Sequence, residues 1–380
     1  MTDIERILPL WRELEAASAD YMLATVIAVE GSSYRKPGAS MLLAPDGRRA
    51  GTVSGGCLEA EVARRAFWLT EKGPVVKRYS SVEDDGDFPY GSGCGGVVFL
   101  LLERRSTAGP LLLALEQAFE RRIPIAVGTV LDGPQIGQRA FAGITDALPE
   151  NASVALTLQN LAESALVETN SIERAVSIDG IETRVWADFR PARPGLLIFG
   201  AGDDALPLLA LAKQMGWFVT VADGRSQLAT RARFPLADAL HVLSMKGLPG
   251  NQPAEELPVF THLQPTDAAV LLTHSFEQDA HILAALLSLG YPLAYIGVLG
   301  PQRRTRELLA EAARLLKVPA NEAPIERWLG QLHAPMGLDL GAESPESIAL
   351  SALAEIQKSF TAATALPLRE KRAASLTAPS

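Results

Sequence analysis

Cysteine is scarce in this sequence, because the 380 residues contain only Cys57 and Cys94. Both cysteines stand among glycines and not in the paired spacings of a disulfide-rich secreted domain. A disulfide scaffold is therefore excluded, and we expect a reducing, cytoplasmic compartment. The five histidines are scattered, and neither a CxxC nor an HxxxH spacing occurs, so the usual zinc sites find no support.

Long apolar runs and blocks of basic charge are also missing. The longest apolar runs, at residues 21–29 and 97–102, fall well short of the about 20 residues that a membrane-spanning helix needs. The charged N-terminus begins an amphipathic helix and lacks the pattern of a secretory signal. The net charge is −9, without a run of Lys and Arg. We therefore expect neither membrane association nor nucleic-acid binding.

What is present is an ordinary globular composition, with 48% hydrophobic and 21% charged residues over a length that suits two or three domains. A linker is predicted at residues 190–195, where two prolines fall in six positions. We expect an N-terminal domain with two Gly-Cys loops at residues 1–190 and a Rossmann-like domain at 193–340. A C-terminal helix with a frayed tail is expected at 341–380.

The first half has the pattern of a strand-rich α+β domain. Apolar positions at helical spacing predict helices at 3–18, 57–72 and 107–121, and β-branched runs predict strands at 21–29, 40–44, 75–80, 97–102 and 124–131. Residues 131–189 read mostly as strands and turns.

The second half alternates short strands with helices, which predicts βαβ units, a parallel sheet and helices on both of its faces. A short helix is expected after the strand at 218–222. The last helix is predicted at 345–358, with Ser344 as its N-cap and Pro345 at its first position. We expect this helix to leave the Rossmann-like domain and return to the first domain.

A glycine turn follows the first strand of this second half. Gly200 permits a tight turn, Gly202 lets a phosphate approach the backbone, and Ala205 takes the third position of the dinucleotide-binding fingerprint. The helix beyond supplies free N–H groups. Asp223 ends the next strand, about where a ribose-binding acid lies. This pattern by itself favours a nucleotide site in the Rossmann crevice.

The same turn has a purely structural interpretation, in which the glycines only let the helix pack against the strand. Asp203 and Asp204 weaken the case for binding, because two carboxylates at the mouth of the site repel a pyrophosphate. Stabilisation of the helix dipole by these acids explains them equally well.

The two cysteine loops are the second feature. Cys57 follows Ser54, Gly55 and Gly56 and opens a helix, where the helix dipole favours the thiolate. Cys94 lies in the glycine-rich run 91–96, which leaves its sulfur accessible and its backbone free to wrap an anion. A thiolate can bind a soft metal, carry sulfur or act as a nucleophile. The alternative is that both cysteines are small buried residues in tight turns.

With these motifs the chain resembles the XdhC/CoxI family, accessory proteins for molybdenum hydroxylases such as xanthine dehydrogenase and CO dehydrogenase. The resemblance covers nearly the whole chain. Its marks are residues 24–26, 31–38, 51–59, 91–96, 199–202, 222–225, 272–274, 295–300 with Arg303 and Arg304, and 333–342. The chain departs from the family pattern at Asp203, where many members have His, and at Ser275, where Asp is common.

The resemblance implies an accessory or maturation factor, a chaperone that binds the molybdenum cofactor (molybdopterin) as cargo. Such a protein protects the cofactor while its sulfido ligand is installed and delivers it to an apo-enzyme. The implied partners are that molybdenum hydroxylase and a cysteine desulfurase, and the implied assembly is a homodimer. No catalytic residue follows with certainty; Cys57 and Cys94 are the candidate thiols and molybdenum contacts. The predicted cofactor-binding residues are Ser54, Gly55, Gly56, Cys57, Gly93, Cys94, Gly95, Gly200, Gly202, Asp223 and His274.

Two alternatives stay open. The chain could be an NAD(P)-dependent oxidoreductase that uses the Rossmann domain and a cysteine, or a regulatory module that senses a nucleotide. The charged residues around these motifs also have ordinary readings. His274 could meet a ligand at the carboxyl edge of the sheet or merely bond a backbone carbonyl. Arg303 and Arg304 could meet a phosphate or form a solvated face, and Arg35 and Lys36 are candidates for an anionic partner.

Overall fold

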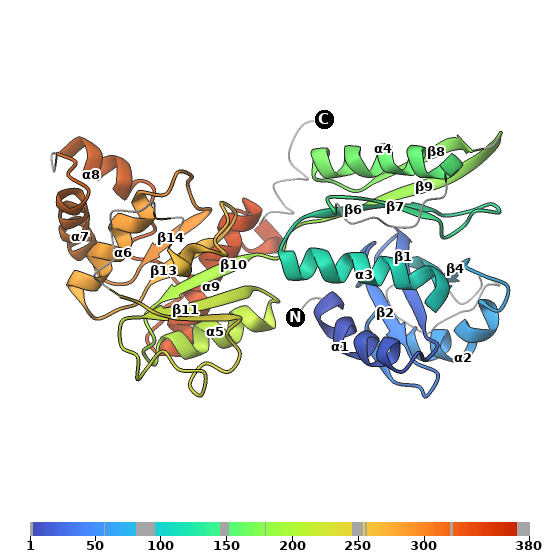
Figure 1. The fold of residues 1–380 in the computed structure, drawn as a ribbon, viewed down its shortest axis with the longest axis horizontal. Coiled ribbons are helices and arrows are strands. Elements are labelled where there is room, and N and C mark those ends of the chain that lie inside the picture. The colour runs from blue at the N-terminus through green and yellow to red at the C-terminus, as the bar shows by residue number, and fades with distance from the viewer. Residues whose placement is uncertain are drawn as a thin grey trace. The chain divides into compact units, whose positions relative to one another are not determined.

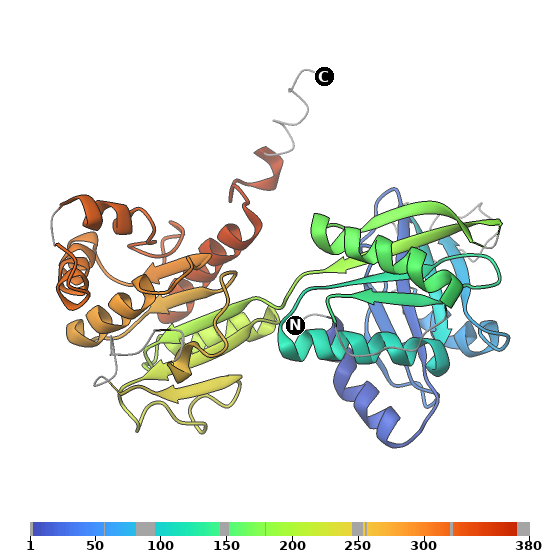
Figure 2. The ribbon, with the colours of Figure 1, turned by 45° about the horizontal axis from the view of Figure 1, so that its top comes forward.

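The computed structural model describes residues 3–56, 58–80, 96–144, 152–178, 180–244, 254, 257–319 and 322–370. The chain divides into two compact units, Met1–Arg193 and Pro194–Ser380. Figure 1 and Figure 2 show each unit from two directions. Cys57, Gly93, Cys94 and Gly95 lie outside the described residues, as do residues 371–380 of the predicted tail.

The first unit begins with a sheet whose described strand pairs are all antiparallel, together with its helices. The described elements, in chain order, are α1 (Asp3–Ala16), β1 (Met22–Glu30), β2 (Ser40–Leu43), β3 (Arg49–Gly51), α2 (Glu59–Leu69), β4 (Val75–Ser80), β5 (Val97–Arg104) and α3 (Arg105–Arg121). The strands within this described part stand in the order β3-β2-β1-β5-β4.

Strand β1 lies at the centre of this sheet and is buried on both faces. Leu23 packs with α1 and α3 on one face, and Met22 and Ala24 pack with α2 on the other. Alternate side chains of a strand point to opposite faces, so a strand covered on both sides reads as a continuous apolar run. The apolar run at 21–29 has this cause.

A second antiparallel sheet completes the unit. It contains β6 (Ile125–Val130), β7 (Arg139–Ala142), β8 (Ile172–Ile178) and β9 (Ile181–Arg190), in the order β7-β6-β9-β8 within the described residues. Helix α4 (Ala152–Glu168) covers one face of this sheet (Figure 1).

Helix α4 corrects the expectation that residues 131–189 are mostly strands and turns. Its buried side chains recur at helical spacing at Val154, Leu158, Leu161 and Ala165. Strand-favouring residues such as Thr157 and Val167 are scattered between them and obscure that spacing in the sequence.

The second unit is a parallel α/β domain. Its sheet consists of β10 (Gly195–Phe199), β11 (Phe218–Asp223), β12 (Ala239–Val242), β13 (Ala268–Leu271) and β14 (Tyr295–Val298). Every neighbouring pair is parallel, and the order within the described residues is β12-β11-β10-β13-β14. This is the Rossmann order, with the reversal between β10 and β13.

Helices cover both faces of the parallel sheet, as predicted. Leu197 and Phe199 face α6 (Phe276–Leu287) and α7 (Gln302–Leu315) on one side, where α8 (Glu322–Leu329) joins the same core. Leu196 and Ile198 face α5 (Ala205–Gln214) and α9 (Pro345–Thr361) on the other. The predicted fold class, a Rossmann-like sheet with helices on both faces plus a strand-rich α+β domain, is confirmed.

Helix α9 differs from the expectation in where it packs. It does not leave the Rossmann-like unit: Ala352, Leu353 and Ile356 lie in the same core as α5. Its start is as predicted, because Ser344 accepts the Ser347 amide in a capping box and Pro345 occupies the first turn. The short helix expected after β11 is also absent from the described residues, which form separate turns at 226–237 before and around Pro235.

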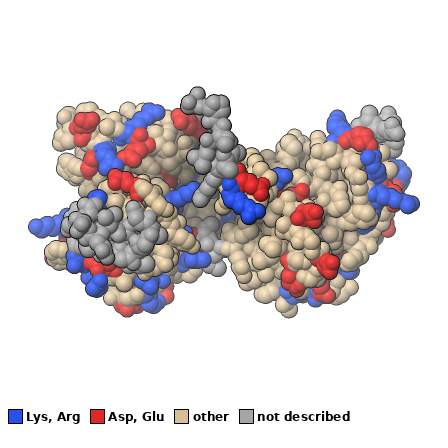
Figure 3. Space-filling model, turned by 180° about the vertical axis from the view of Figure 1, so that it is seen from behind, with Lys and Arg blue, Asp and Glu red and all other residues tan. Residues whose placement is uncertain are grey.

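Acidic and basic side chains are interspersed over both units on the face shown in Figure 3. Among the described residues, none of the helices combines the length and the apolar character that crossing a bilayer requires.

Candidate functional site

Several loops of the first unit meet where the strands β1, β4 and β5 of its first sheet end or begin; we call this place the loop edge. Glu30 at the end of β1 pairs with Val97 at the start of β5, and Ser80 at the end of β4 pairs with Val97 from the other side. The loop 31–38 after β1 therefore begins at the same edge as Ser80 and Gly96, the described residues that flank the segment carrying Cys94. Antiparallel pairing brings them together although they lie about 60 residues apart in sequence.

Gly96 makes the closest described contact between these loops. A Cβ atom at Gly96 would lie 2.1 Å from the carbonyl oxygen of Ser32 and 3.2 Å from that of Glu30. Real Cβ atoms do not approach an oxygen so closely, so position 96 accepts only glycine without movement of the 31–38 loop. The last glycine of the 91–96 run is therefore needed for packing.

The loop before Cys57 is organised by a buried carboxylate that the sequence reading did not single out. Glu59 accepts the backbone amides of Val53 and Ser54 through Oε1, at 3.1 and 2.8 Å. Its Oε2 accepts the Ser54 hydroxyl at 2.6 Å. The Ser54 Oγ in turn accepts the amides of Gly56 and Leu58, at 3.2 and 3.1 Å. The described residues on both sides of Cys57 are thus tied to one side-chain pair.

The environment keeps Glu59 ionised. Only 2% of the residue is exposed, and burial alone would raise its pKa. The hydrogen bonds from Ser54 and Val53 outweigh the burial and hold the pKa of Glu59 below its ordinary value. The sequence signal for Glu59 is an acid at the start of a helix, shortly after the run Ser54-Gly55-Gly56. Such an acid usually indicates only an interaction with the helix dipole, so the signal is not specific.

Tyr34 and Lys36 present exposed side chains among the loops at this edge. The Tyr34 ring lies beside Gly55, where an added Cβ would be 3.9 Å from it, and 76% of Tyr34 is exposed. Lys36 is exposed, whereas Arg35 is paired with Asp3 of α1. Of the two predicted anion contacts, Arg35 thus has a structural partner and Lys36 faces solvent.

The glycine turn of the second unit lies where β10 ends. Gly200 has φ +120°, a conformation that favours glycine, and a Cβ there would lie 2.9 Å from the Leu272 carbonyl carbon. Gly202 is different, because a Cβ on it would meet nothing within 4 Å among the described residues. Gly200 is therefore required for packing next to β13, and Gly202 leaves its backbone open.

Asp223 is fully buried and engaged within the protein. Its Oδ1 accepts the amide and Nε of Arg225 at 2.8 and 3.0 Å, and its Oδ2 accepts the Ala201 amide and the Arg225 Nη2, both at 2.7 Å. A carboxylate has about four lone-pair positions, so these contacts saturate it. Burial would raise the pKa of Asp223, but the bonds from Arg225 and Ala201 lower it overall.

This saturation bears on the predicted ribose contact. A ribose hydroxyl could reach Asp223 only by displacing one of its present donors. Asp223, which the sequence pattern assigned to a nucleotide, ties the glycine turn to the end of β11 through its hydrogen bond from Ala201. The role of Asp223 as a ligand contact stays a prediction.

The acids that follow the turn have different surroundings. Asp203 pairs with Arg233, which also donates to the Ala201 carbonyl at 3.2 Å. Asp204 occupies the N-cap position of α5, and within the described residues its side chain makes no capping hydrogen bond. The repulsion expected at the mouth of the turn is thus partly offset by Arg233.

A buried network lies beneath the exposed His274. Asp279 on α6 accepts the Thr273 hydroxyl at 2.5 Å and Arg304 Nη2 at 2.7 Å, and its side chain is fully buried. Burial raises the pKa of Asp279 in spite of these partners. Arg304 is therefore a structural residue, whereas Arg303 is 90% exposed and pairs with Glu307 along the helix.

The structure places the predicted residues in two groups. Ser54, Gly55 and Gly56 lie at the loop edge of the first unit, and Gly200, Gly202, Asp223 and His274 lie at the carboxyl edge of the parallel sheet in the second. Cys57, Gly93, Cys94 and Gly95 fall outside the described residues. Within the part of the chain that the structure does describe, no group of three or more His, Cys, Asp or Glu side chains could hold a metal ion.

The fold and these loops define a two-unit protein that joins a glycine-loop α+β unit to a Rossmann domain. Family models agree: the XdhC and CoxI family matches residues 14–80, and the XdhC Rossmann domain matches residues 196–356. A probable xanthine dehydrogenase subunit of Bacillus subtilis is 31% identical over 88% of this chain and 92% of its own length. The chain therefore belongs to the XdhC and CoxI family.

Two further relatives extend this comparison. The molybdenum cofactor insertion chaperone PaoD of Escherichia coli is 26% identical over 88% of this chain and 82% of its own length. A crystal structure described as a xanthine dehydrogenase from Bacillus halodurans superposes with a TM-score of 0.67 and 28% identity. It covers 95% of this chain and 96% of its own.

Proposed function

We propose that this protein is a molybdenum cofactor chaperone. It holds the cofactor as cargo, helps its sulfuration, and inserts it into a molybdenum hydroxylase of the xanthine dehydrogenase or CO dehydrogenase type. The observation that carries the proposal is the similarity to a cofactor insertion chaperone along 88% of the chain, which spans both units. The family membership points the same way.

The loop edge of the first unit is the part that we assign to the cargo. Free backbone amides in glycine-rich loops bind phosphate, and a thiolate is a soft ligand suited to molybdenum or to carrying sulfur. In this proposal Ser54, Gly55, Gly56 and Gly93 to Gly95 surround the cargo, with Cys57 and Cys94 among them. The Ser54–Glu59 pair supports the proposal because it holds the first loop in a defined shape before any cargo arrives.

The carboxyl edge of the Rossmann sheet is the second part of the proposal, through Gly200, Gly202 and His274. The open backbone at Gly202 supports contact with an anionic group there. We do not assign NAD(P) to this edge, because Asp223 has no acceptor position left for a ribose. The partners in this proposal are the apo-hydroxylase and a cysteine desulfurase, with a homodimer as the assembly.

The test is purification from a host that makes the cofactor, followed by mass spectrometry for molybdopterin and assay of an activated client hydroxylase. We expect the wild-type protein to carry molybdopterin. The double variant Cys57→Ser, Cys94→Ser is expected to retain less cargo and to activate the client poorly. The exposed Ser288→Ala change, at the C-cap of α6 in the second unit, is the control for the effects of substitution and purification.

Two results would count against this proposal. Unchanged molybdopterin content together with unchanged client activation in the double variant would remove the role of the cysteines. Protein without any pterin or molybdenum, but with tight NAD(P)H binding and turnover, would favour the oxidoreductase instead.

A further inference from the structure

The outer face of α2 carries a large aromatic side chain in solvent. Trp68 is 70% exposed, although it lies near the end of a helix whose inner face is well packed. Val62 and Ala66 on that inner face are fully buried against the first sheet, so the helix does not need Trp68 for its own packing. Covering an aromatic side chain removes about 150–250 Å² from water, and exposed tryptophans are therefore strong anchors for a partner protein.

Basic side chains surround this tryptophan. Arg64 lies four residues before Trp68, on the same side of the helix, and its side chain is 73% exposed. Lys72 is exposed in the turn that follows the helix. Four basic residues stand against two acidic ones, Glu61 among them, in the stretch 60–77, although the whole chain has a net charge of −9. We call this face the α2 surface, and its residues are Arg64, Arg65, Trp68 and Lys72. Its local charge is positive, which favours an acidic partner.

Arg104 of β5 holds the end of α2 in place. Its guanidinium carbon lies 5.2 Å from the centre of the Phe67 ring, and its Nε donates to the Thr70 hydroxyl at 3.1 Å. The same guanidinium donates to the Phe67 carbonyl and, at 2.7 Å, to Asp20. An anchor on an element that is fixed in this way loses little conformational entropy when a partner covers it.

The α2 surface lies near the loop that we assign to the cargo. Helix α2 starts at Glu59, two residues after Cys57, and Trp68 follows nine residues later. At about 1.5 Å per residue this is roughly 14 Å along the helix axis. A standard protein interface covers about 800 Å² of each partner, which is roughly 30 Å across. A partner centred on Trp68 therefore reaches the loop before Cys57.

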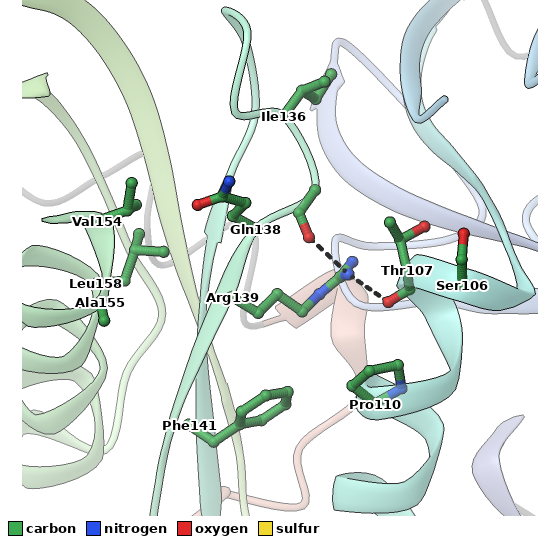
Figure 4. Close-up of a pocket in the computed structure, with 11 residues that line it drawn as sticks. Ser106, Thr107, Pro110, Ile136, Gln138, Arg139, Phe141, Val154, Ala155 and Leu158 are labelled. Atoms are coloured by element: carbon green, nitrogen blue, oxygen red, sulfur yellow. Dashed lines mark hydrogen bonds between the residues drawn. The ribbon is translucent and has the colours of Figure 1, made fainter. Parts of the chain in front are cut away.

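A pocket in the same unit has a different character. It has a volume of about 320 Å³ and lies along β7 between α3 and α4, with Gln138 and Arg139 in its lining. Figure 4 shows Arg139 pointing toward α3, and its Nη1 donates to the carbonyls of Thr107 and Gly137, both at 3.1 Å. The buried Glu103 neutralises its charge. A recess whose charge is neutralised inside the protein has nothing that projects toward a macromolecule, whereas the α2 surface does.

We propose that the α2 surface docks the apo-hydroxylase that receives the cargo. The hydroxylase presents an apolar pocket for Trp68 and an acidic rim for Arg64 and Lys72. The inference rests on the proposed chaperone function, which supplies this partner: an acceptor has to cover the loop before Cys57 to take the cargo without exposing it to water. Opposite charges speed the encounter, and the buried indole slows dissociation.

Binding of the cofactor-free client hydroxylase to the full chain, measured by biolayer interferometry, tests this docking site. Trp68→Ala removes the anchor, and Leu156→Ala is its control, because Leu156 is 68% exposed on α4 of the same unit. Arg64→Glu reverses one charge. Its control is Arg314→Glu, because Arg314 is 70% exposed and pairs with an acid three residues before it, as Arg64 does. Molybdopterin content and thermal unfolding are measured for every protein.

We expect Trp68→Ala to weaken binding of the hydroxylase about thirtyfold, as loss of a central anchor does. Arg64→Glu is expected to weaken it about tenfold, through slower association and mainly at low salt. Both controls should bind like the wild type, and all four variants should carry as much molybdopterin as the wild type.

The possible failures can be told apart. Wild-type protein without molybdopterin contradicts the proposed function and, with it, the docking site. Wild-type protein that carries its cargo but does not bind the hydroxylase overturns the docking site alone, and so do folded Trp68→Ala and Arg64→Glu proteins that bind it as tightly as the wild type. A change in the oligomeric state of these variants, measured by sedimentation, assigns the α2 surface to a second copy of the chain and also overturns the proposal.

Discussion

The carboxylate of Glu59 receives the hydroxyl of Ser54 at 2.6 Å, and this pair shapes the loop that leads to Cys57. The Ser54 hydroxyl oxygen in turn accepts the amides of Gly56 and Leu58 and so holds the backbone on both sides of Cys57. Four described hydrogen bonds to backbone amides therefore depend on two side chains. A loop that is pre-organised in this way loses less entropy when it closes on a ligand.

Glu59→Gln is expected to loosen this loop. A glutamine amide accepts through its oxygen only. Either the backbone amides of Val53 and Ser54 or the hydroxyl of Ser54 therefore loses its acceptor. We expect a loss of about 1–3 kcal/mol in the free energy of unfolding, measured in urea. Glu71→Gln, which changes an exposed acid just beyond α2, should leave stability within about 0.5 kcal/mol. Equal stability of both variants would contradict the organising role.

The Glu59 contribution should depend on pH with a definite sign. The folded-state pKa of Glu59 is lowered from 4.5 by its hydrogen bonds. A carboxyl with a lowered pKa stabilises the fold fully above its unfolded pKa, and this stabilisation is lost as the pH falls through the folded pKa. The difference in unfolding free energy between wild type and Glu59→Gln should therefore be constant near neutral pH and shrink below about pH 4.5. A difference that grows on acidification would show the opposite linkage.

Gly96→Ala is expected to damage the loop edge by steric overlap with Ser32. The new methyl carbon would stand 2.1 Å from a backbone oxygen, so the 31–38 loop must move. Overpacking of this kind costs about 1–3 kcal/mol, and more where backbone must shift. Gly55→Ala is the control, since its nearest contact would be the Tyr34 ring at 3.9 Å. Thermal unfolding should separate the two variants, and equal melting temperatures would refute the tight contact.

Arg225→Ala is expected to destabilise the Rossmann-like unit. It leaves the buried Asp223 carboxylate with two backbone amides and without a charged partner. Loss of a partner from a buried polar group costs about 1–3 kcal/mol, and more for a charged group. Arg303→Ala removes an exposed pair along α7 and should change stability by about 0.5 kcal/mol or less. Urea unfolding of both variants measures the contrast, and an unaffected Arg225→Ala protein would show that the two amides suffice.

The strand and helix pattern of the second unit could be predicted because its signals are local. Short apolar strands alternate with amphipathic helices, and the turn at Gly200 and Gly202 marks the first crossover. Helix α4 escaped prediction since its buried positions are interrupted by strand-favouring residues, and the helical spacing becomes visible only against the sheet that it covers.

The candidate site was predictable in its residue types and not in its contacts. Glycines around Cys57 and Cys94 indicate open backbone and a reactive thiol from the sequence alone. The pairing of β1 with β5 is what brings Gly96 against Ser32, because strand register depends on which faces are buried. The pocket lined by Gln138 and Arg139 has no signal in the sequence, because α3, α4 and β7 form it only when the chain is folded.

The sequence by itself determined the class of each half, the positions of the glycine turns and the family to which the chain belongs, since all three depend on residue types at short spacing. Only the tertiary structure showed that Asp223 accepts the Ala201 amide of the glycine turn, and that Glu59 holds the loop before Cys57. The physical reason is that a buried carboxylate is stable only when nearby groups donate hydrogen bonds to it. Which donors those are is decided by the fold that packs them around it.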